Sequence, residues 1–305
     1  MFMTSDAERF RQMNEAFYRG APADYIFTRL ALLMAFEQDT EAVAQALQSG
    51  VDLHGVHIEA APDTPIDSAE VAKYVTIEST LLAHHSVEAL LRLFLAHCSQ
   101  PECPPLAVAS LTSPVQFRER LDMILDDNLL DDVQREVGMI VVGVHRDDTD
   151  ERLAMRNGCA AIIRDLAEFW LRDASLYNAL KHGLAGAAGS AVFRLGTSPD
   201  DDDATTVFGE GVSIEYLRRA EVNGQGTVWQ SATTWIDLHE TFAAITLSSQ
   251  LIDNLWSLAR WRYVAGDTPM RLHVPTGRLK DLAKPSGMVR DLAFNQFQVV
   301  KRGRR

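Results

Sequence analysis

The chain has 305 residues, of which 47% are hydrophobic and 23% are charged, and its formal net charge at pH 7 is −13. This composition is typical of a globular protein with a substantial core. The excess of acids disfavours loose, sequence-independent binding to nucleic acid, because such binding depends on cationic side chains. Three cysteines, an odd number, favour free thiols over a disulfide framework, so we expect a cytoplasmic protein.

Neither export nor a membrane segment is expected. The first eight residues carry acids where a secretory signal would carry Lys or Arg, and no apolar segment follows them. The most apolar window, residues 25–36, is too short to cross a bilayer and contains Arg29.

The first fifty residues predict a group of amphipathic helices. Apolar residues recur every three or four positions over 6–18, 24–38 and 40–48, and Ser49-Gly50 ends the last helix. Weak alternation over 51–58 predicts a strand. Two domain arrangements stay open. Either residues 1–50 form a separate helical unit ahead of a core at 51–305, or the whole chain is one domain.

A long helix is predicted between two breaks that contain prolines. Pro62 and Pro65 precede it, and Pro101 prevents its continuation beyond about residue 100. Ser68 and Glu70 favour its first turn.

Shorter helices are predicted after this long one. Ser113 and Pro114 form a cap and first-turn pair for a helix through Asp126. Helices are also expected at 129–137, 148–172, 174–184 and 238–264.

Three segments predict strands instead of helices. Residues 191–195, 212–220 and 227–236 are rich in alternating, β-branched or aromatic residues and are separated by Gly, Asn and Asp. A further strand is expected at 270–274, and the rest of the chain is expected to be loosely structured. The predicted fold class is therefore mainly α, a helical bundle with a small antiparallel β insertion at about residues 190–237.

The long helix carries ionisable residues on an otherwise apolar background. Glu78, His85 and Arg92 recur every seven residues and so lie near one line of its surface. Glu88 is one turn from both His85 and Arg92. Such a stripe can bind an anion or stabilise a developing charge. It can equally be a buried ion-pair network that fixes the register of neighbouring helices.

Arg92 and His97 stand five positions apart near the end of this helix, in the order Arg, four residues, His. In this pattern the chain resembles the HEPN superfamily of helical-bundle proteins, many of which are metal-independent ribonucleases or partners in toxin–antitoxin and phage-defence systems. The resemblance implies a homodimer in which Arg92 stabilises charge on the scissile phosphate of RNA. It also implies that His97 is a general acid or base at the ribose 2′-hydroxyl. Alternatively, His97 interacts with the helix dipole and the last carbonyl groups, which needs no catalysis.

A second helix repeats this arrangement of polar residues. Asn178 and His182 are four positions apart, as are Tyr177 and Lys181, so each pair shares a face. With Arg172, these side chains offer an amide, an imidazole and cations to a phosphate or carboxylate. We expect this helix and the long helix to form one polar, substrate-binding pocket. Lys181 and His182 are also favoured near a helix C-terminus for structural reasons alone.

No local motif points to a cofactor or a metal ion, and we expect neither. The sequence contains no Walker-type loop, G-x-G-x-x-G, G-x-S-x-G or H-E-x-x-H. Asp52 and His54 can share a strand face, but they are too few for a metal site, and Cys98 and Cys103 alone do not indicate zinc.

Two functional classes therefore stay open. As an interaction protein or defence-system component, the chain would use its polar residues to hold the bundle together. The β insertion, with its acidic run Asp200–Asp203, would then present a surface to a protein partner. As a metal-independent endoribonuclease, it would use Arg92 and His97 on RNA. If Arg92, His97 and His182 converge on solvent, a catalytic role is favoured. If they pair with one another under a covering layer, a structural role is favoured.

Overall fold

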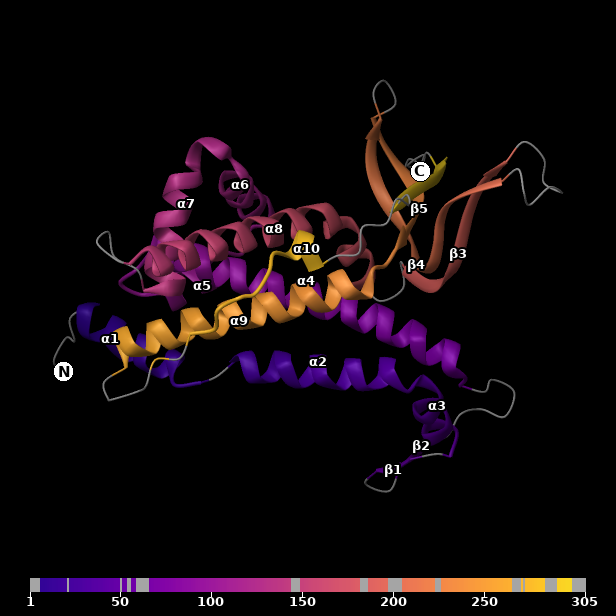
Figure 1. The fold of residues 1–305 in the computed structure, drawn as a ribbon, viewed down its shortest axis with the longest axis horizontal. Helices are drawn as coiled ribbons and strands as arrows, with labels where there is room; N and C mark the ends of the chain where they lie inside the picture. The colour runs from indigo at the N-terminus through magenta and orange to yellow at the C-terminus, as the bar shows by residue number, and fades with distance from the viewer. Residues whose placement is uncertain are drawn as a thin grey trace, which may run out of the picture. The chain divides into compact units, whose positions relative to one another are not determined.

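The computed structural model describes residues 6–20, 22–49, 51–53, 56–58, 66–143, 149–181, 186–196, 205–222, 226–264, 270, 272–282 and 290–297. The chain is mainly helical and carries a four-stranded antiparallel sheet, which confirms the predicted fold class (Figure 1). It divides into two compact units, each assembled from three stretches of the chain. The first unit contains Met1–Leu30, Leu82–Arg172 and Phe242–Ala283, and the second contains Ala31–Leu81, Asp173–Thr241 and Lys284–Arg305. A separate domain at residues 1–50 stays a prediction.

Most helices lie where apolar spacing predicts them. They are α1 (Asp6–Tyr18), α2 (Pro22–Gln38), α3 (Thr40–Gln48), α4 (Ser68–Ser99), α6 (Pro114–Leu125), α7 (Leu130–Val137) and α9 (Leu238–Tyr263). Side-chain caps explain two of the starts. The Asp39 carboxylate accepts a hydrogen bond from the Ala42 amide at 3.0 Å, and the Ser113 hydroxyl accepts one from the Gln116 amide at 3.4 Å.

Two short helices were not predicted, α5 (Pro104–Ser110) and α10 (Leu279–Leu282). Pro104 lies in the first turn of α5, where the missing N–H of proline removes no intrahelical hydrogen bond. The proline-containing segment after α4 therefore ends that helix before Pro101 and begins the next one at Pro104. A 3-10 turn at Asp127–Leu129 and a π-helical turn at Gly138–Val142 flank α7.

The predicted break near residue 173 is wrong, because α8 (Asp150–Lys181) is one continuous helix. Neither Gly nor Pro occurs between Arg172 and Tyr177, so nothing in the local sequence interrupts the helical hydrogen bonds. Asp173, a weak helix former, is buried and accepts a hydrogen bond from Arg290 at 2.7 Å. The residue left between the two predicted helices is therefore held inside one helix by a tertiary contact.

The sheet has the strand order β3-β4-β5-β6, and all neighbours are antiparallel. Its strands are β3 (Gly186–Gly196), β4 (Thr205–Val222), β5 (Gly226–Trp235) and β6 (Asp291–Phe297). The first three confirm the predicted insertion, and β3 and β4 are longer than expected. The fourth strand corrects the expectation that the C-terminal part is loosely structured, and residues 270 and 272–274 are not in a strand.

Tertiary contacts explain why β6 forms. The Thr234 hydroxyl donates a hydrogen bond to Asp291 at 2.5 Å, and the Trp235 amide donates one to the Arg290 carbonyl at 2.9 Å. Arg290 also pairs with Asp173. These partners are far away in the sequence, so local alternation gave no sign of them.

The segment predicted as one strand at 51–58 is a small hairpin of β1 (Val51–Leu53) and β2 (Val56–Ile58). The inner face of the larger sheet packs on helices of the same unit. Its buried cluster comprises Leu176, Ala179, Leu180, Ile214, Tyr216 and Ala232, with Ile77 and Leu81 of α4 against it. This packing fixes which face of β4 and β5 is left for solvent.

Candidate functional site

Arg92, the first predicted catalytic residue, joins three elements of the first unit. Its Nε donates a hydrogen bond to Glu88 at 2.7 Å, and its guanidinium also donates one to the Leu111 carbonyl at the end of α5. The guanidinium lies 4.5 Å from the centre of the Phe117 ring of α6. Arg92 therefore fastens α4 to α5 and α6.

His97, the second predicted catalytic residue, is buried with 5% of its surface exposed. Its Nε2 lies 2.7 Å from the Tyr18 hydroxyl in a hydrogen bond. Tyr18 stacks on Tyr263, with ring centres 5.5 Å apart, and packs edge-to-face with Trp256, with ring centres 4.9 Å apart. His97 therefore joins α4 to α1 within a cluster of aromatic rings.

Two further hydrogen bonds close this aromatic cluster. The Trp256 indole donates to the Gly20 carbonyl at 2.6 Å, and the Tyr263 hydroxyl donates to the Pro101 carbonyl at 2.5 Å. Both rings come from α9, so the cluster ties the end of α9 to the chain that follows α1 and α4.

Burial decides the charge state of the pair between Tyr18 and His97. Loss of hydration, together with the charge of the nearby Arg262, lowers the pKa of His97 to about 3. Burial likewise raises the pKa of Tyr18 well above its ordinary value. Both groups are neutral at physiological pH, and a neutral, covered imidazole is poorly placed to supply a proton to RNA.

The two predicted catalytic residues contact different neighbours. Arg92 is engaged by α5 and α6, whereas His97 is engaged by α1 and by rings of α9. The sequence does place both near the end of one helix, as expected. It contains no local signal for the partners that each side chain meets.

The remaining predicted site residues fall into the two units. In the first, Glu88 binds Arg92, His85 is exposed, and the Arg172 guanidinium lies 5.2 Å from the Phe169 ring centre. In the second, Glu78 is half-buried, Tyr177 is buried, Asn178 is exposed, and the Lys181 ammonium lies 5.7 Å from the Tyr177 ring centre. His182, the acidic run 200–203 and His54 lie outside the described residues. A pocket shared by the two helices stays a prediction.

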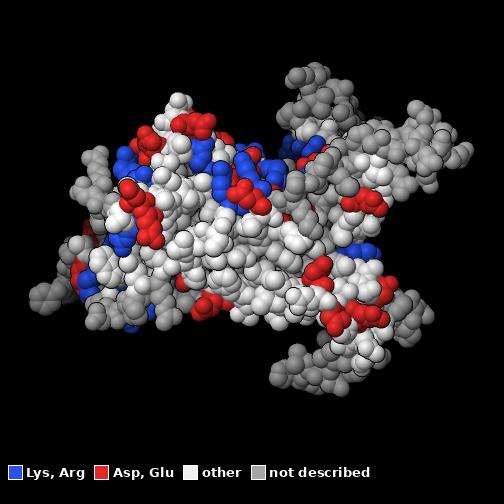
Figure 2. All heavy atoms as spheres, viewed as in Figure 1, with Lys and Arg blue, Asp and Glu red and all other residues white. Residues whose placement is uncertain are grey.

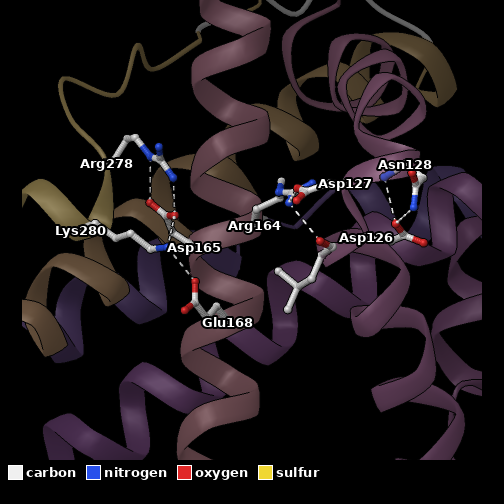
Figure 3. A network of polar contacts seen from close by, with 9 residues as sticks. Asp126, Asp127, Asn128, Arg164, Asp165, Glu168, Arg278 and Lys280 are labelled. Atoms are coloured by element: carbon white, nitrogen blue, oxygen red, sulfur yellow. Dashed lines mark hydrogen bonds and ion pairs between the residues drawn. The ribbon is translucent and has the colours of Figure 1, made fainter. Parts of the chain in front are cut away.

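An ion-pair cluster on α8 was missed by sequence reasoning (Figure 3). The Asp165 carboxylate is 3% exposed and accepts two hydrogen bonds from Arg278, at 3.1 Å from Nε and 2.6 Å from Nη2. Lys280 lies 3.8 Å from Asp165 and 2.8 Å from Glu168. On the adjoining face, Arg164 pairs with Asp127 at 2.6 Å and reaches the Leu125 carbonyl at 3.0 Å.

The pKa shifts agree with this geometry. The hydrogen bond from Lys280 lowers the pKa of Glu168 and raises that of Lys280, and the hydrogen bond to Asp165 raises the pKa of Arg278. The partners are 113 positions apart, which explains why no local pattern revealed them. The cluster holds the segment around α10 on α8, and its acidic and basic side chains pair with one another.

A buried amide holds the preceding part of this segment. The Asn254 side chain of α9 accepts a hydrogen bond from the His273 amide at 2.6 Å and donates one to the His273 carbonyl at 2.9 Å. The His273 imidazole then meets Asp253 at 2.8 Å. Backbone recognition by Asn254 replaces the strand expected at 270–274.

The outward face of the sheet is different, because apolar side chains lie on it uncovered. Leu217 of β4 is 49% exposed and Trp229 of β5 is 36% exposed. Leu217 pairs with Ser231 and Arg219 pairs with Trp229, so Leu217 and Trp229 are diagonal neighbours on one face. We refer to Leu217, Arg219 and Trp229 as the outward patch.

Comparison with family models, curated proteins and solved structures found no match to the chain. Within the described part of the chain, no helix is both long and apolar enough to cross a membrane. The same residues contain no group of three or more His, Cys, Asp or Glu side chains able to hold a metal ion. The fold and the contacts above therefore carry the functional interpretation.

Proposed function

We propose that the chain is an interaction protein, in which the buried polar residues stabilise the helices and the outward patch binds a protein partner. The single observation that carries the proposal is the exposed pair Leu217 and Trp229 on a sheet whose other face is packed. Tryptophan and arginine are enriched among the residues that dominate binding energy at protein interfaces, and Trp229 and Arg219 are both in the outward patch.

The engagement of Arg92 and His97 supports this proposal over catalysis. Arg92 is held by Glu88 and a carbonyl group, and His97 is covered and neutral. Each of the two side chains thus has a structural partner of its own, and His97 is also buried, which supports a structural role for both residues.

The charge distribution favours a protein over a nucleic acid as partner. The net charge is −13, and on the face shown in Figure 2 the basic and acidic side chains of the described residues are interspersed, without a continuous basic stripe. Arg219 stands directly opposite Trp229. The patch therefore fits an apolar site with a carboxylate placed to meet Arg219.

The test compares the affinity of one partner for protein variants that differ only in the outward patch. Partners crosslinked to the wild-type chain in its source cells would be identified, purified and titrated against wild type, Leu217→Glu and Trp229→Ala. We expect each substitution to weaken binding by on the order of thirtyfold, as for a central interface residue. The matched control is Val115→Glu, because Val115 is also exposed but lies on α6. Equal affinity of the partner for wild type and Leu217→Glu would overturn the proposal.

RNA cleavage remains the second candidate, as the HEPN resemblance implies, together with the homodimer, the defence role and the cytoplasmic location. It is tested by incubating structured and unstructured RNA with the purified protein in EDTA, alongside Arg92→Ala and His97→Ala variants whose folding is checked by circular dichroism. We expect no cleavage above background. Metal-independent cleavage that is lost in both folded variants would replace the interaction proposal with a ribonuclease.

A further inference from the structure

On the side of β3 opposite β4, the main-chain N–H and C=O groups of alternate residues point away from the sheet. The Ile236 amide donates a hydrogen bond to the Val212 carbonyl at 3.0 Å, so even-numbered residues of β4 bond toward β5 and odd-numbered residues toward β3. Their partners on β3 are odd-numbered as well, because Ala187 faces Glu215 and Gly189 faces Ser213. The outward N–H and C=O groups therefore belong to Gly186, Ala188, Ser190 and Val192.

This edge lacks the features that usually prevent strand pairing. Exposed edge strands are commonly protected by charged residues, prolines or bulges. Gly186–Phe193 contains no charge and no proline, and most of its side chains are small. The first charged residue is Arg194, where the register between β3 and β4 also shifts. Among the described residues, no strand pairs with this side of β3, and Val192 is 48% exposed.

We infer that β3 pairs antiparallel with β3 of a second copy of this chain, across a two-fold axis at Gly189. Only this register pairs all four outward residues with one another, because Gly186 then faces Val192 and Ala188 faces Ser190 of the second copy. It also ends before the shifted register at Arg194. The pairing completes the main-chain hydrogen bonds of both edges at once.

The self-complementary edge favours a second copy as the occupant, because its four outward residues pair with one another in a single register. Each chain carries −13, so two copies repel one another over most of their surfaces. The uncharged edge Gly186–Phe193 allows close approach without bringing like charges together. This inference goes beyond the outward patch, since it uses the edge of the sheet and does not depend on any other partner.

The first test removes one outward hydrogen-bond donor and leaves the pairing with β4 intact. Ser190→Pro lacks the outward N–H and places a ring against the incoming strand, and proline is tolerated on an edge whose N–H faces solvent. Ser190→Ala keeps the N–H and is the matched control. We expect wild type and Ser190→Ala to sediment as dimers at micromolar concentration and Ser190→Pro to sediment as a folded monomer. A monomeric wild type, or a folded Ser190→Pro that remains dimeric, would overturn the inference.

The second test fixes the register and does not depend on the folding of the proline variant. In the proposed dimer, Gly189 faces Gly189 of the second copy in a non-hydrogen-bonded pair, with Cα atoms about 4.5 Å apart, which suits a disulfide. We expect Gly189→Cys to form a disulfide-linked dimer under mild oxidation. Glu215→Cys is the matched control and should remain unlinked, because Glu215 is exposed but its strand position is paired on both sides, with Ala187 of β3 and Thr233 of β5. Failure of Gly189→Cys to crosslink faster than Glu215→Cys would refute this register.

Discussion

The free energy of unfolding should fall steeply as the pH is lowered from about 6.5 toward 3, and replacement of His97 should remove much of this dependence. The pKa of His97 is about 3 in the folded protein, against an ordinary value of 6.5. Between these values the unfolded chain binds one more proton than the folded protein. The contribution of His97 is therefore fully present above pH 6.5 and is lost at about 1.4 kcal/mol per pH unit as the pH falls.

The measurement is urea unfolding of wild type and His97→Gln between pH 7 and pH 5, a range in which few ordinary carboxylates titrate. The informative quantity is the slope of the free energy of unfolding against pH, because the substitution also removes packing contacts and lowers stability at every pH. His239→Gln is the matched control, since His239 is exposed near the start of α9. A slope in His97→Gln equal to that of wild type would show that His97 accepts a proton in the folded state.

Disruption of the ion pair between Asp165 and Arg278 should destabilise the protein asymmetrically. Arg278→Ala leaves the buried Asp165 carboxylate with Lys280 as its nearest cation in this cluster, at 3.8 Å. We expect a cost of about 2 kcal/mol, at the lower end for a broken buried pair, because the Arg278 side chain is 48% exposed. Asp165→Asn should lower the free energy of unfolding by less, because the released Arg278 side chain can be solvated by water.

A double-mutant cycle of these two substitutions separates their coupling from other effects, and equilibrium unfolding supplies the four free energies. The double variant should be more stable than the sum of the single effects predicts. Arg135→Ala is the matched control, because the pair of Arg135 and Asp132 is exposed on both sides and should contribute little. Additive effects of Asp165→Asn and Arg278→Ala would contradict a structural role for the pair.

Local sequence predicted those elements whose stabilising contacts are themselves local. Helices α1, α3 and α6 follow from apolar spacing, and α3 and α6 also have side-chain caps next to their first residues. Strand β6 could not be predicted in this way, because it depends on Thr234 and Trp235, more than fifty residues earlier.

The same distinction applies to the candidate site. Spacing correctly placed Glu88 beside Arg92, one turn away on the same helix. It could not show that Tyr18, 79 positions earlier, covers His97. Burial is decided by elements that meet only in the folded chain, and burial sets the pKa on which the catalytic interpretation of His97 depends.

The central strand β4 has neighbours on both sides over only part of its length. Its residues Thr205–Tyr216 pair with β3, and its residues Ser213–Val222 pair with β5, so only Ser213–Tyr216 are shared. The β3 edge thus lies in the part of the sheet where β4 pairs with β3, and the outward patch lies in the part where β4 pairs with β5. Binding at the β3 edge therefore leaves the outward patch accessible, and each chain has two separate binding surfaces. Two copies joined through β3 would display two identical patches and could bind a multivalent partner with avidity.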